Sequence, residues 1–352
     1  MLTSLRLRNF RCFDSLNCPL PAGTTVFIGE NAQGKTSVLE AVCVLLRLQS
    51  PRTLRQQELV KFGQPEFGIA GTCSGRELKH TMANGVRGLF LDGVSTSKST
   101  DYLAASGLVV WMGNGDLELV TGSGEPRRRY LDFLGIQLFP EYRDALKRYE
   151  KALKTRNFLL KRDASPNWRQ VDAYTQVLVE NGVVLTRLRE KLLGILQPHA
   201  AAAHQRISRV PEVLTLNYIN ASGVDFATTL RERREQEAVR RVTLAGPHRD
   251  DFSLAIDDRP AAQYASEGQQ RTIALSLKLS QATLLEALRE TAPLLLLDDI
   301  FGELDPHRRN ALLTALPQDS QRLITTTHLD WMNESFVPEG IFEVSQGQVT
   351  AR

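Results

Sequence analysis

The feature that most restricts how this chain can fold is the eight-residue segment GENAQGKT at Gly29–Thr36. It matches the pattern G-x-x-x-x-G-K-T, and it stands between a strand-like segment at Thr24–Ile28 and a helical pattern from about Lys35. Its glycines let backbone N–H groups approach phosphate oxygens, and a helix N-terminus adds positive potential. The sequence therefore predicts a strand, a phosphate-binding loop and a helix in succession. An incidental glycine-rich turn is the alternative.

The loop residues have separate predicted roles in binding ATP. Lys35 would reach the β- and γ-phosphates, and the hydroxyl of Thr36 would hold Mg²⁺. The other predicted ATP ligands are the rest of the loop and the following serine: Gly29, Glu30, Asn31, Ala32, Gln33, Gly34 and Ser37.

Two aspartates follow the apolar segment Leu294–Leu297. A strand that is apolar throughout suits a parallel sheet covered on both faces, so Asp298 would lie at the carboxyl edge, where a metal ion could bind. Asp299 could orient or deprotonate an attacking water. Such a pair is often only a solvated strand end, but the phosphate-binding loop favours the catalytic interpretation. His328, after the strand-like RLITTT, is a candidate γ-phosphate sensor, although a lone histidine is more often structural.

A second candidate phosphate site lies far along the chain, in the segment SEGQ at Ser266–Gln269. It precedes a helical pattern and places Gly268 where a phosphate could approach. Taken alone, the segment is more often a plain helix cap. The question it raises is why one chain would carry two phosphate sites.

Periodicity divides the chain into three segments. Residues 1–124 read as strands, turns and a helix, and a mixed pattern returns at residues 242–352. Between them, at residues 125–241, apolar residues recur at three- and four-residue steps, which predicts long helices of about 25 residues each. We expect an α/β domain built from the first and last segments, interrupted by a helical insert.

The composition indicates more about the protein's cellular environment than about its binding partners. The four cysteines show no C-x-x-C spacing, which indicates free thiols in a reducing compartment. No apolar run approaches the roughly 18 to 20 residues that cross a bilayer. We expect a cytoplasmic protein without a membrane partner. The net charge of +3 is too small to indicate nucleic acid by itself.

The order of the motifs resembles the ABC-type ATPase head. SEGQ is followed by LLLLDD, by ELDP at Glu303–Pro306 and by TTTH. In that family the signature segment closes over the γ-phosphate held by a second head. The resemblance implies an α/β ABC-type head with a P-loop and a mixed sheet (lobe I), an inserted α-helical domain (lobe II), and an ATP-dependent homodimer. It also implies that Ser266, Gly268 and Gln269 bind the partner's ATP.

Further segments resemble the RecF family of recombination mediators over nearly the whole chain. They are LRNFRCF at Leu7–Phe13, GEPRRRYLDF at Gly124–Phe133, AGPHRDDF at Ala245–Phe252 and SEGQQRTIALSLKL at Ser266–Leu279. The resemblance implies a role for each of five residues: Arg11 near the nucleotide, Asp298 as the Walker B carboxylate that holds Mg²⁺ with Thr36, Asp299 at the general-base position, Asp305 in the D-loop and His328 as the switch.

The same resemblance implies a function. It is slow, DNA-stimulated ATP hydrolysis by a protein that binds double-stranded DNA or junctions between single- and double-stranded DNA. The implied partners are RecR and RecO, with which the protein would help to load RecA during recombinational repair and replication restart.

The sequence departs from the ABC pattern at three residues and in one segment. Ala265 and Glu267 stand where transporters usually carry Leu and Gly. Asp299 replaces the usual Glu, and its shorter side chain would hold water less closely, which fits slow turnover. No glutamine lies in VVWMGNGDLELV, where a Q-loop is expected, and Asn114 is a poor substitute.

Basic residues concentrate on and before the first predicted insert helix. They are Arg127, Arg128, Arg129, Arg143, Lys147, Arg148, Lys151, Lys154, Arg156, Lys161 and Arg162. They form either a surface that follows DNA phosphates or a solvated helix face with i, i+4 ion pairs.

Three alternatives to a RecF-like function remain at this point. A transporter ATPase subunit shares the head motifs, but the long helical insert fits that class poorly. An SMC-type chromosome-maintenance ATPase has far longer coiled-coil arms. A non-enzymatic DNA clamp that senses ATP is the hardest to separate from an enzyme.

Overall fold

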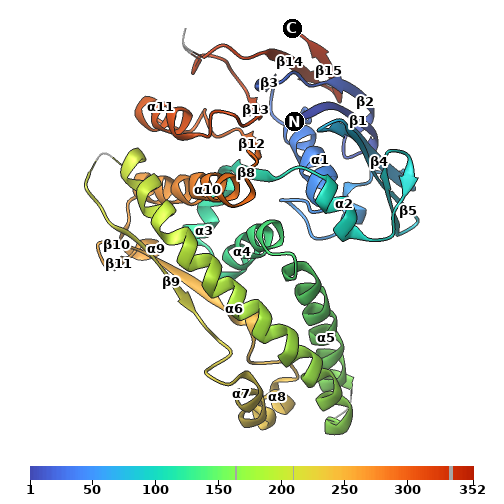
Figure 1. Ribbon diagram of the computed structural model, residues 1–352, viewed down its shortest axis with the longest axis vertical. Coiled ribbons are helices and arrows are strands. Elements are labelled where there is room, and N and C mark those ends of the chain that lie inside the picture. Colours follow the sequence, from blue (N-terminus) through green and yellow to red (C-terminus); the bar gives the residue numbers. More distant parts are fainter. Residues whose placement is uncertain (163–164, 209, 333–335) are drawn as a thin grey trace. The chain divides into compact units, whose positions relative to one another are not determined.

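The computed structural model describes all residues except 163–164, 209 and 333–335, and it divides into two compact units (Figure 1). Unit 1 comprises Met1–Gly115 and Ala282–Arg352, and unit 2 comprises Asp116–Gln281. The second division falls within helix α10, Glu267–Arg289. The domain limits expected from the sequence, after residues 124 and 241, stay a prediction.

Unit 1 contains a six-stranded mixed sheet that positions the predicted phosphate loop. Its strand order is β15-β14-β3-β13-β12-β8, and every neighbouring pair except β14–β15 is parallel. The strands predicted before the phosphate loop, before the two aspartates and before His328 are confirmed as β3, β12 and β13. The bounds are β3 Thr24–Ile28, β8 Val109–Gly113, β12 Leu294–Asp298, β13 Arg322–Thr326, β14 Gly340–Ser345 and β15 Gln348–Ala351. Parallel pairing places the carboxyl ends of β3, β13, β12 and β8 at one edge.

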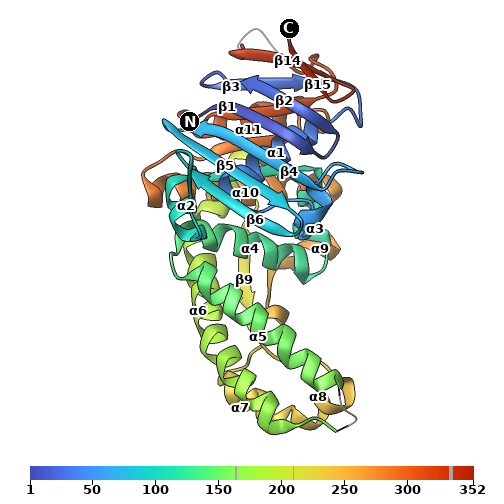
Figure 2. The same cartoon turned by 90° about the vertical axis from the view of Figure 1, so that its right-hand side faces the viewer.

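An antiparallel sheet of order β2-β1-β4-β5-β6-β7 forms the other layer of unit 1 (Figure 2). Helix α1, Lys35–Arg47, contacts strands of both sheets, and every residue from Ser37 to Arg47 is buried. The remaining elements of unit 1 are β1 Leu2–Phe10, β2 Phe13–Pro19, η1 Gln56–Leu59, β4 Glu66–Cys73, β5 Arg76–Ala83, β6 Val86–Leu91, β7 Val94–Ser95, α2 Ser99–Ala105 and α11 Pro306–Ala315.

Unit 2 is built on two long helices, α5 (Tyr142–Arg162) and α6 (Trp168–Ile207). Their facing apolar residues form a core with helix α7 (Phe226–Glu232), in which Tyr149, Leu185 and Phe226 are representative buried members. The predicted length of about 25 residues is close for α5, which has 21, but wrong for α6, which has 40 and contains Pro198. Pro198 does not end α6, because packing of the apolar face of this helix stabilises it.

Unit 2 also contains a three-stranded antiparallel sheet of order β11-β10-β9. Strand β9 lies inside the segment that was expected to be helical, so the insert is not helical throughout. The bounds of the remaining elements are η2 Asn114–Leu117 at the division between the units, α3 Glu118–Thr121, α4 Gly124–Leu138, β9 Leu214–Ile219, α8 Arg234–Arg240, η3 Pro247–Arg249, β10 Asp251–Ile256, β11 Arg259–Pro260 and α9 Ala261–Tyr264.

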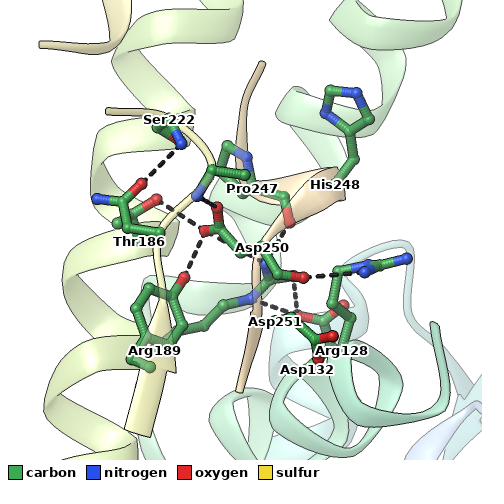
Figure 3. Close-up of polar contacts among 12 residues, drawn as sticks. Arg128, Asp132, Thr186, Arg189, Ser222, Pro247, His248, Asp250 and Asp251 are labelled. Carbon is green, nitrogen blue, oxygen red and sulfur yellow. Dashed lines mark hydrogen bonds and ion pairs between the residues drawn. The ribbon is translucent and has the colours of Figure 1, made fainter. Parts of the chain in front are cut away.

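Two of the motifs that resemble RecF meet in a buried polar network of unit 2 (Figure 3). Arg189 of α6 donates to Asp132 Oδ1 at 2.7 Å and to the carbonyl of Pro247 at 2.6 Å. Asp250 accepts from Thr186 Oγ1 at 3.2 Å and lies 3.9 Å from the Arg189 guanidinium. Because Arg189 and Asp250 are almost fully buried, loss of Arg189 would leave the Asp250 carboxylate without its ion-pair partner inside the unit.

The four cysteines are free thiols, as expected. Within the described parts of the chain, no helix combines the length and the apolar character that a membrane span requires.

His80 is a buried ionisable residue in strand β5. Its side chain is fully buried, and its ring meets Phe67 edge-on at 5.5 Å. Among the residues that the structure describes, neither ring nitrogen has a hydrogen-bond partner. Burial, with a smaller effect from the charge of Arg87, lowers the pKa of His80 from 6.5 to about 3. The neutral imidazole is therefore the form that the fold accommodates.

This burial predicts an acid-sensitive stability. Between the folded pKa of about 3 and the ordinary 6.5, the unfolded chain binds more protons at this position than the folded chain. The stability that the neutral His80 contributes to the folded state is fully present above about pH 6.5. This contribution decreases by up to about 1.4 kcal/mol for each unit that the pH falls below this value. Urea unfolding at pH 7 and pH 5 should show a smaller pH effect for His80→Leu than for the unchanged chain. The exposed control His307→Leu should keep the full effect, and an undiminished pH effect in His80→Leu would contradict the prediction.

Candidate nucleotide-binding site

The loop between β3 and α1 has a conformation that depends on its glycines. Gly34 has φ +111°, and a Cβ there would lie 2.7 Å from Cys12 Sγ. A Cβ on Gly29 would lie 2.2 Å from the carbonyl oxygen of Val344. Both distances are too short for any side chain, and a left-handed φ also favours glycine at position 34. The glycines are thus required by packing within unit 1 as well as by any phosphate.

Lys35 lies over this loop with its ammonium group near the backbone. Its Nζ donates to the carbonyl oxygens of Gly29 at 2.7 Å and Glu30 at 2.8 Å. Burial lowers the pKa of Lys35, and the charges of Asp299 and Asp298 oppose that shift. The cation is held at the N-terminus of α1, where phosphate oxygens can replace the carbonyls as its partners.

Asp298 joins the loop to the neighbouring strands through one carboxylate oxygen. Its Oδ1 accepts from the hydroxyls of Thr36 and Thr325, each at 2.8 Å. Burial raises the pKa of Asp298, while the two hydroxyl bonds lower it. The hydroxyl of Thr36 and the carboxylate of Asp298, predicted to hold Mg²⁺, are therefore in direct contact, and both are oxygen groups of the kind Mg²⁺ prefers.

Thr325 is a site residue that the sequence analysis did not identify. Strands β12 and β13 pair Asp298 with Thr325, and the Thr325 hydroxyl also accepts from the backbone N–H of Asp299 at 3.0 Å. This residue therefore contacts both aspartates. The available signal was its place in the strand-like segment RLITTT, which ends shortly before His328.

Asp299 and His328 converge beside Gly302. A Cβ on Gly302 would lie 3.7 Å from His328 Nε2 and 4.0 Å from Asp299 Oδ1. Asp299 has φ +54°, a left-handed conformation that turns the chain sharply after β12. The pKa of Asp299 is raised by burial and by Glu303, whereas the charges of Lys35 and His328 lower it.

Arg11 is held by helix α1. Its guanidinium donates to both carboxylate oxygens of buried Glu40, at 2.8 and 2.7 Å, and to the carbonyl of Glu58 at 2.8 Å. The hydrogen bond to Glu40 is the main cause that raises the pKa of Arg11. Glu40 was not singled out from the sequence, although a carboxylate within the apolar run SVLEAVCVLL was a usable signal. Contact of Arg11 with nucleotide stays a prediction.

The remaining predicted residues of unit 1 have defined positions. Glu30 and Asn31 are exposed on the loop, Ala32 has φ +64°, and Ser37 is buried in α1. Gln33 Oε1 accepts from the backbone N–H of Gln346 at 2.6 Å.

Two more positions of unit 1 concern the D-loop and the Q-loop. Asp305 caps α11 by accepting from the N–H of Arg308 at 3.0 Å. Asn114 directly follows β8, whose Gly113 pairs with Asp298, and its Nδ2 donates to Glu303 Oε1 at 2.7 Å. An amide therefore stands next to the aspartates, but its assignment to the Q-loop stays a prediction.

The signature residues lie in unit 2, at the start of α10. Ser266 and Gln269 form a reciprocal capping box: Gln269 N–H donates to Ser266 Oγ at 3.3 Å, and Ser266 N–H donates to Gln269 Oε1 at 2.8 Å. Gly268 lies between them in the first turn. The simple reading of SEGQ as a helix cap is correct, and the N-terminus that it caps is the feature a phosphate would meet.

Comparison with known proteins identifies the family. A family model described as an AAA domain matches residues 4–181. The DNA replication and repair protein RecF of Synechococcus sp. (strain JA-3-3Ab) is 38% identical, over 99% of this chain and 97% of that protein. RecF of Halalkalibacterium halodurans is 36% identical, over 98% of each. The chain belongs to the RecF family.

Solved structures support the same assignment and confirm the expected ATPase head. The recombination mediator protein RecF-ATPrS in the RecFOR pathway is 27% identical, with a TM-score of 0.89 over 100% of this chain and 98% of that one. RecF-ATP gives the same TM-score at 28% identity. An Smc head bound to the C-winged helix domain of ScpA has a TM-score of 0.59 at 13% identity, which shows a shared fold alone. The RecF-family chain thus has the ABC/SMC-like head.

The position of Thr325 generates a prediction about ATP hydrolysis. Thr325→Val removes the hydroxyl that donates to Asp298, and a hydrogen bond to a charged group contributes about 1.5–3 kcal/mol. We expect the hydrolysis rate to fall roughly 10- to 100-fold. The acid limb of the pH–rate profile should also move to higher pH, because the pKa of Asp298 loses a cause that lowers it. Thr325→Ser keeps the hydroxyl and should retain most activity. Equal rates and pH profiles for the valine variant and the unchanged protein would exclude this role.

Proposed function

We propose that this RecF-family chain is a DNA-repair ATPase that binds ATP with Mg²⁺ and dimerises on it. The observation that carries the proposal is the contact of Thr36 with Asp298 beside Lys35 and Asp299, within a chain that matches RecF over its full length. These groups are the oxygen ligands, the cation and the acid that phosphoryl transfer to water needs.

Each residue has a role in the proposed reaction. Lys35 and the loop N–H groups bind the β- and γ-phosphates and neutralise their charge. Thr36 and Asp298 would hold Mg²⁺, which supplies further positive charge at the phosphate oxygens when bound. Asp299, with its pKa raised by burial, orients the attacking water and accepts its proton, and His328 beside it contacts the γ-phosphate. The short Asp299 side chain reaches water less closely than a glutamate would, which supports slow turnover.

The second phosphate site serves a second copy of the chain. In the proposed dimer, the capped N-terminus of α10 faces the γ-phosphate that the other copy holds at Lys35, with Ser266 and Gly268 as its ligands. Asp305, at the start of α11, lies near the same nucleotide. This arrangement is supported by the presence of two helix N-termini that begin at candidate phosphate motifs, one in each unit. ATP then stabilises the dimer as a shared ligand.

The proposed DNA surface contains fewer residues than the basic set identified in the sequence. Arg127 is paired with Asp251 at 2.7 Å, and Arg156 is buried against Glu237 at 2.6 Å, so both are structural. Arg128 donates to the carbonyl of Asp250, and Arg129 pairs with Glu125 within α4. What supports DNA binding is the exposed basic set on α5, the helix labelled in Figure 2. Its members are Lys147, Arg148, Lys151, Lys154, Lys161 and Arg162.

Such a surface recognises the DNA backbone and not its sequence, because lysine and arginine contact phosphates there. We infer that double-stranded DNA, or a junction with single-stranded DNA, binds along α5 and stimulates hydrolysis. RecR and RecO are the proposed protein partners, in a pathway that loads RecA. The RecFOR pathway named for the RecF-ATPrS structure supports this part of the proposal.

Mixing two inactive variants tests the shared site. Lys35→Met disables the phosphate loop and Ser266→Arg blocks the signature, so each variant alone should lose nearly all ATPase activity. In a mixed dimer one composite site is intact, and we expect up to about half of the dimers to carry it when the two assemble at random. ATPase measured across mixing ratios should therefore rise to a maximum near 1:1. No recovery would argue that each site is contained within one chain.

Charge reversal on α5 tests the DNA surface. Lys147→Glu, Lys151→Glu and Lys154→Glu together should weaken duplex binding at least tenfold and reduce the salt dependence of log K by about 0.9 per lost phosphate contact. Binding should be measured from 50 to 200 mM salt. A control with the same net-charge change at exposed sites of unit 1 is Arg55→Glu, Lys98→Glu and Arg352→Glu. Equal loss in both triple variants would show only a general charge effect.

A further inference from the structure

The signature segment is fixed by a residue that no motif contains. Glu212, in the connection between α6 and β9, accepts from Gln269 Nε2 at 2.7 Å through its Oε1. Gln269 is the residue whose other amide atom, Oε1, accepts the N–H of Ser266. The contacts therefore run without a break from Glu212 through Gln269 to the backbone of Ser266, all within unit 2.

Glu212 decides which way the Gln269 amide points. An ionised carboxylate can only accept hydrogen bonds, so the amide must turn its NH₂ group toward Glu212. Its carbonyl oxygen is then directed at Ser266, where only an acceptor can pair with the backbone N–H. Without the carboxylate, the two amide orientations would compete, and one of them places two donors, Nε2–H and the Ser266 N–H, against each other.

Glu212 is itself held in place by buried groups. Its Oε2 accepts from His204 Nε2 at 3.1 Å and from Ser208 Oγ at 3.3 Å. His204 belongs to α6 and is fully buried, and its Nδ1 lies 3.4 Å from Ser276 Oγ on α10. The glutamate is only 8% exposed. A long helix and the signature helix are thus tied together at the capped turn.

We propose that Glu212 is a positioning residue for the signature segment. It orients Gln269, and through Gln269 it sets the capping turn that presents Ser266 and Gly268 to a nucleotide. Gln269, predicted from the sequence to bind nucleotide, acts in this scheme as the link between Glu212 and Ser266. The inference rests on the proposed function, since it concerns how the second phosphate site is built.

The test is a complementation experiment with Glu212→Ala. This variant should bind ATP at its own Lys35 loop with an affinity within about twofold of the unchanged chain, because the loop lies in the other unit. Its ATPase activity and its ATP-dependent dimerisation should fall at least tenfold. Mixed with Lys35→Met it should recover activity, because one composite site is intact. Mixed with Ser266→Arg it should not, because both copies then lack a working signature.

Two further variants separate positioning from general destabilisation. Glu212→Gln retains an oxygen acceptor for Gln269 and should keep at least half of the activity, whereas the exposed neighbour change Val210→Ala should have no effect. Recovery of Glu212→Ala with Ser266→Arg, or full activity of Glu212→Ala alone, would overturn the inference. If Glu212→Ala recovers activity with neither Lys35→Met nor Ser266→Arg and also binds ATP weakly, the variant has a folding defect. That result would also overturn the inference.

A direct measurement keeps the inference testable apart from the proposed function. Hydrogen exchange at the Ser266 and Gln269 amides should be at least tenfold faster in Glu212→Ala and near normal in Glu212→Gln, because the capping box protects both N–H groups. Unchanged exchange would overturn the positioning role whatever the ATPase assays show. Failure of the Lys35→Met and Ser266→Arg mixture would instead reject the shared site and leave the exchange result to decide on Glu212.

Discussion

The parallel alignment of β3, β13, β12 and β8 is the constraint on which the head depends. Parallel strands in register place their carboxyl ends at one edge, so the phosphate loop after β3 and the aspartates after β12 meet there. The two 2.8 Å hydrogen bonds from Thr36 and Thr325 to Asp298 are a direct product of that alignment. They supply donors to a partly buried carboxylate, whose removal from water would otherwise be costly.

Several buried carboxylates in the two units are each paired with an arginine. Glu40 is paired with Arg11, Asp250 with Arg189, and Glu237 with Arg156, and each of these carboxylates is almost fully buried. Such pairs contribute little net stability, but removal of one partner leaves the other charge unpaired. They therefore fix the geometry of the segments that carry them. Glu212 follows this pattern, with the difference that the geometry it fixes is that of the signature turn.

The basic residues show why charge alone is a poor guide to a DNA surface. Arg127, Arg156 and Lys147 are all basic residues in the sequence, yet each of the two arginines is paired with a carboxylate and the lysine is exposed on α5. An arginine makes several hydrogen bonds in a fixed plane, which suits it to the interior of a polar network. Lysines on an exposed helix face stay available to phosphate. Only the side chains that remain solvated carry the proposed electrostatic role.

Short sequence segments specify the local structures, namely the loop around Gly34, the strand that ends at Asp298 and the helix cap at Ser266. These structures depend on backbone sterics and hydrogen bonds within a few residues. The lack of C-x-x-C spacing likewise indicated the free cysteines. Tertiary packing, in contrast, brings Thr325 to both aspartates, pairs Glu40 with Arg11, places β9 within the insert and sets Glu212 against Gln269. Those outcomes depend on which distant strands and helices become neighbours and on which polar groups lose their water, and no short segment encodes either.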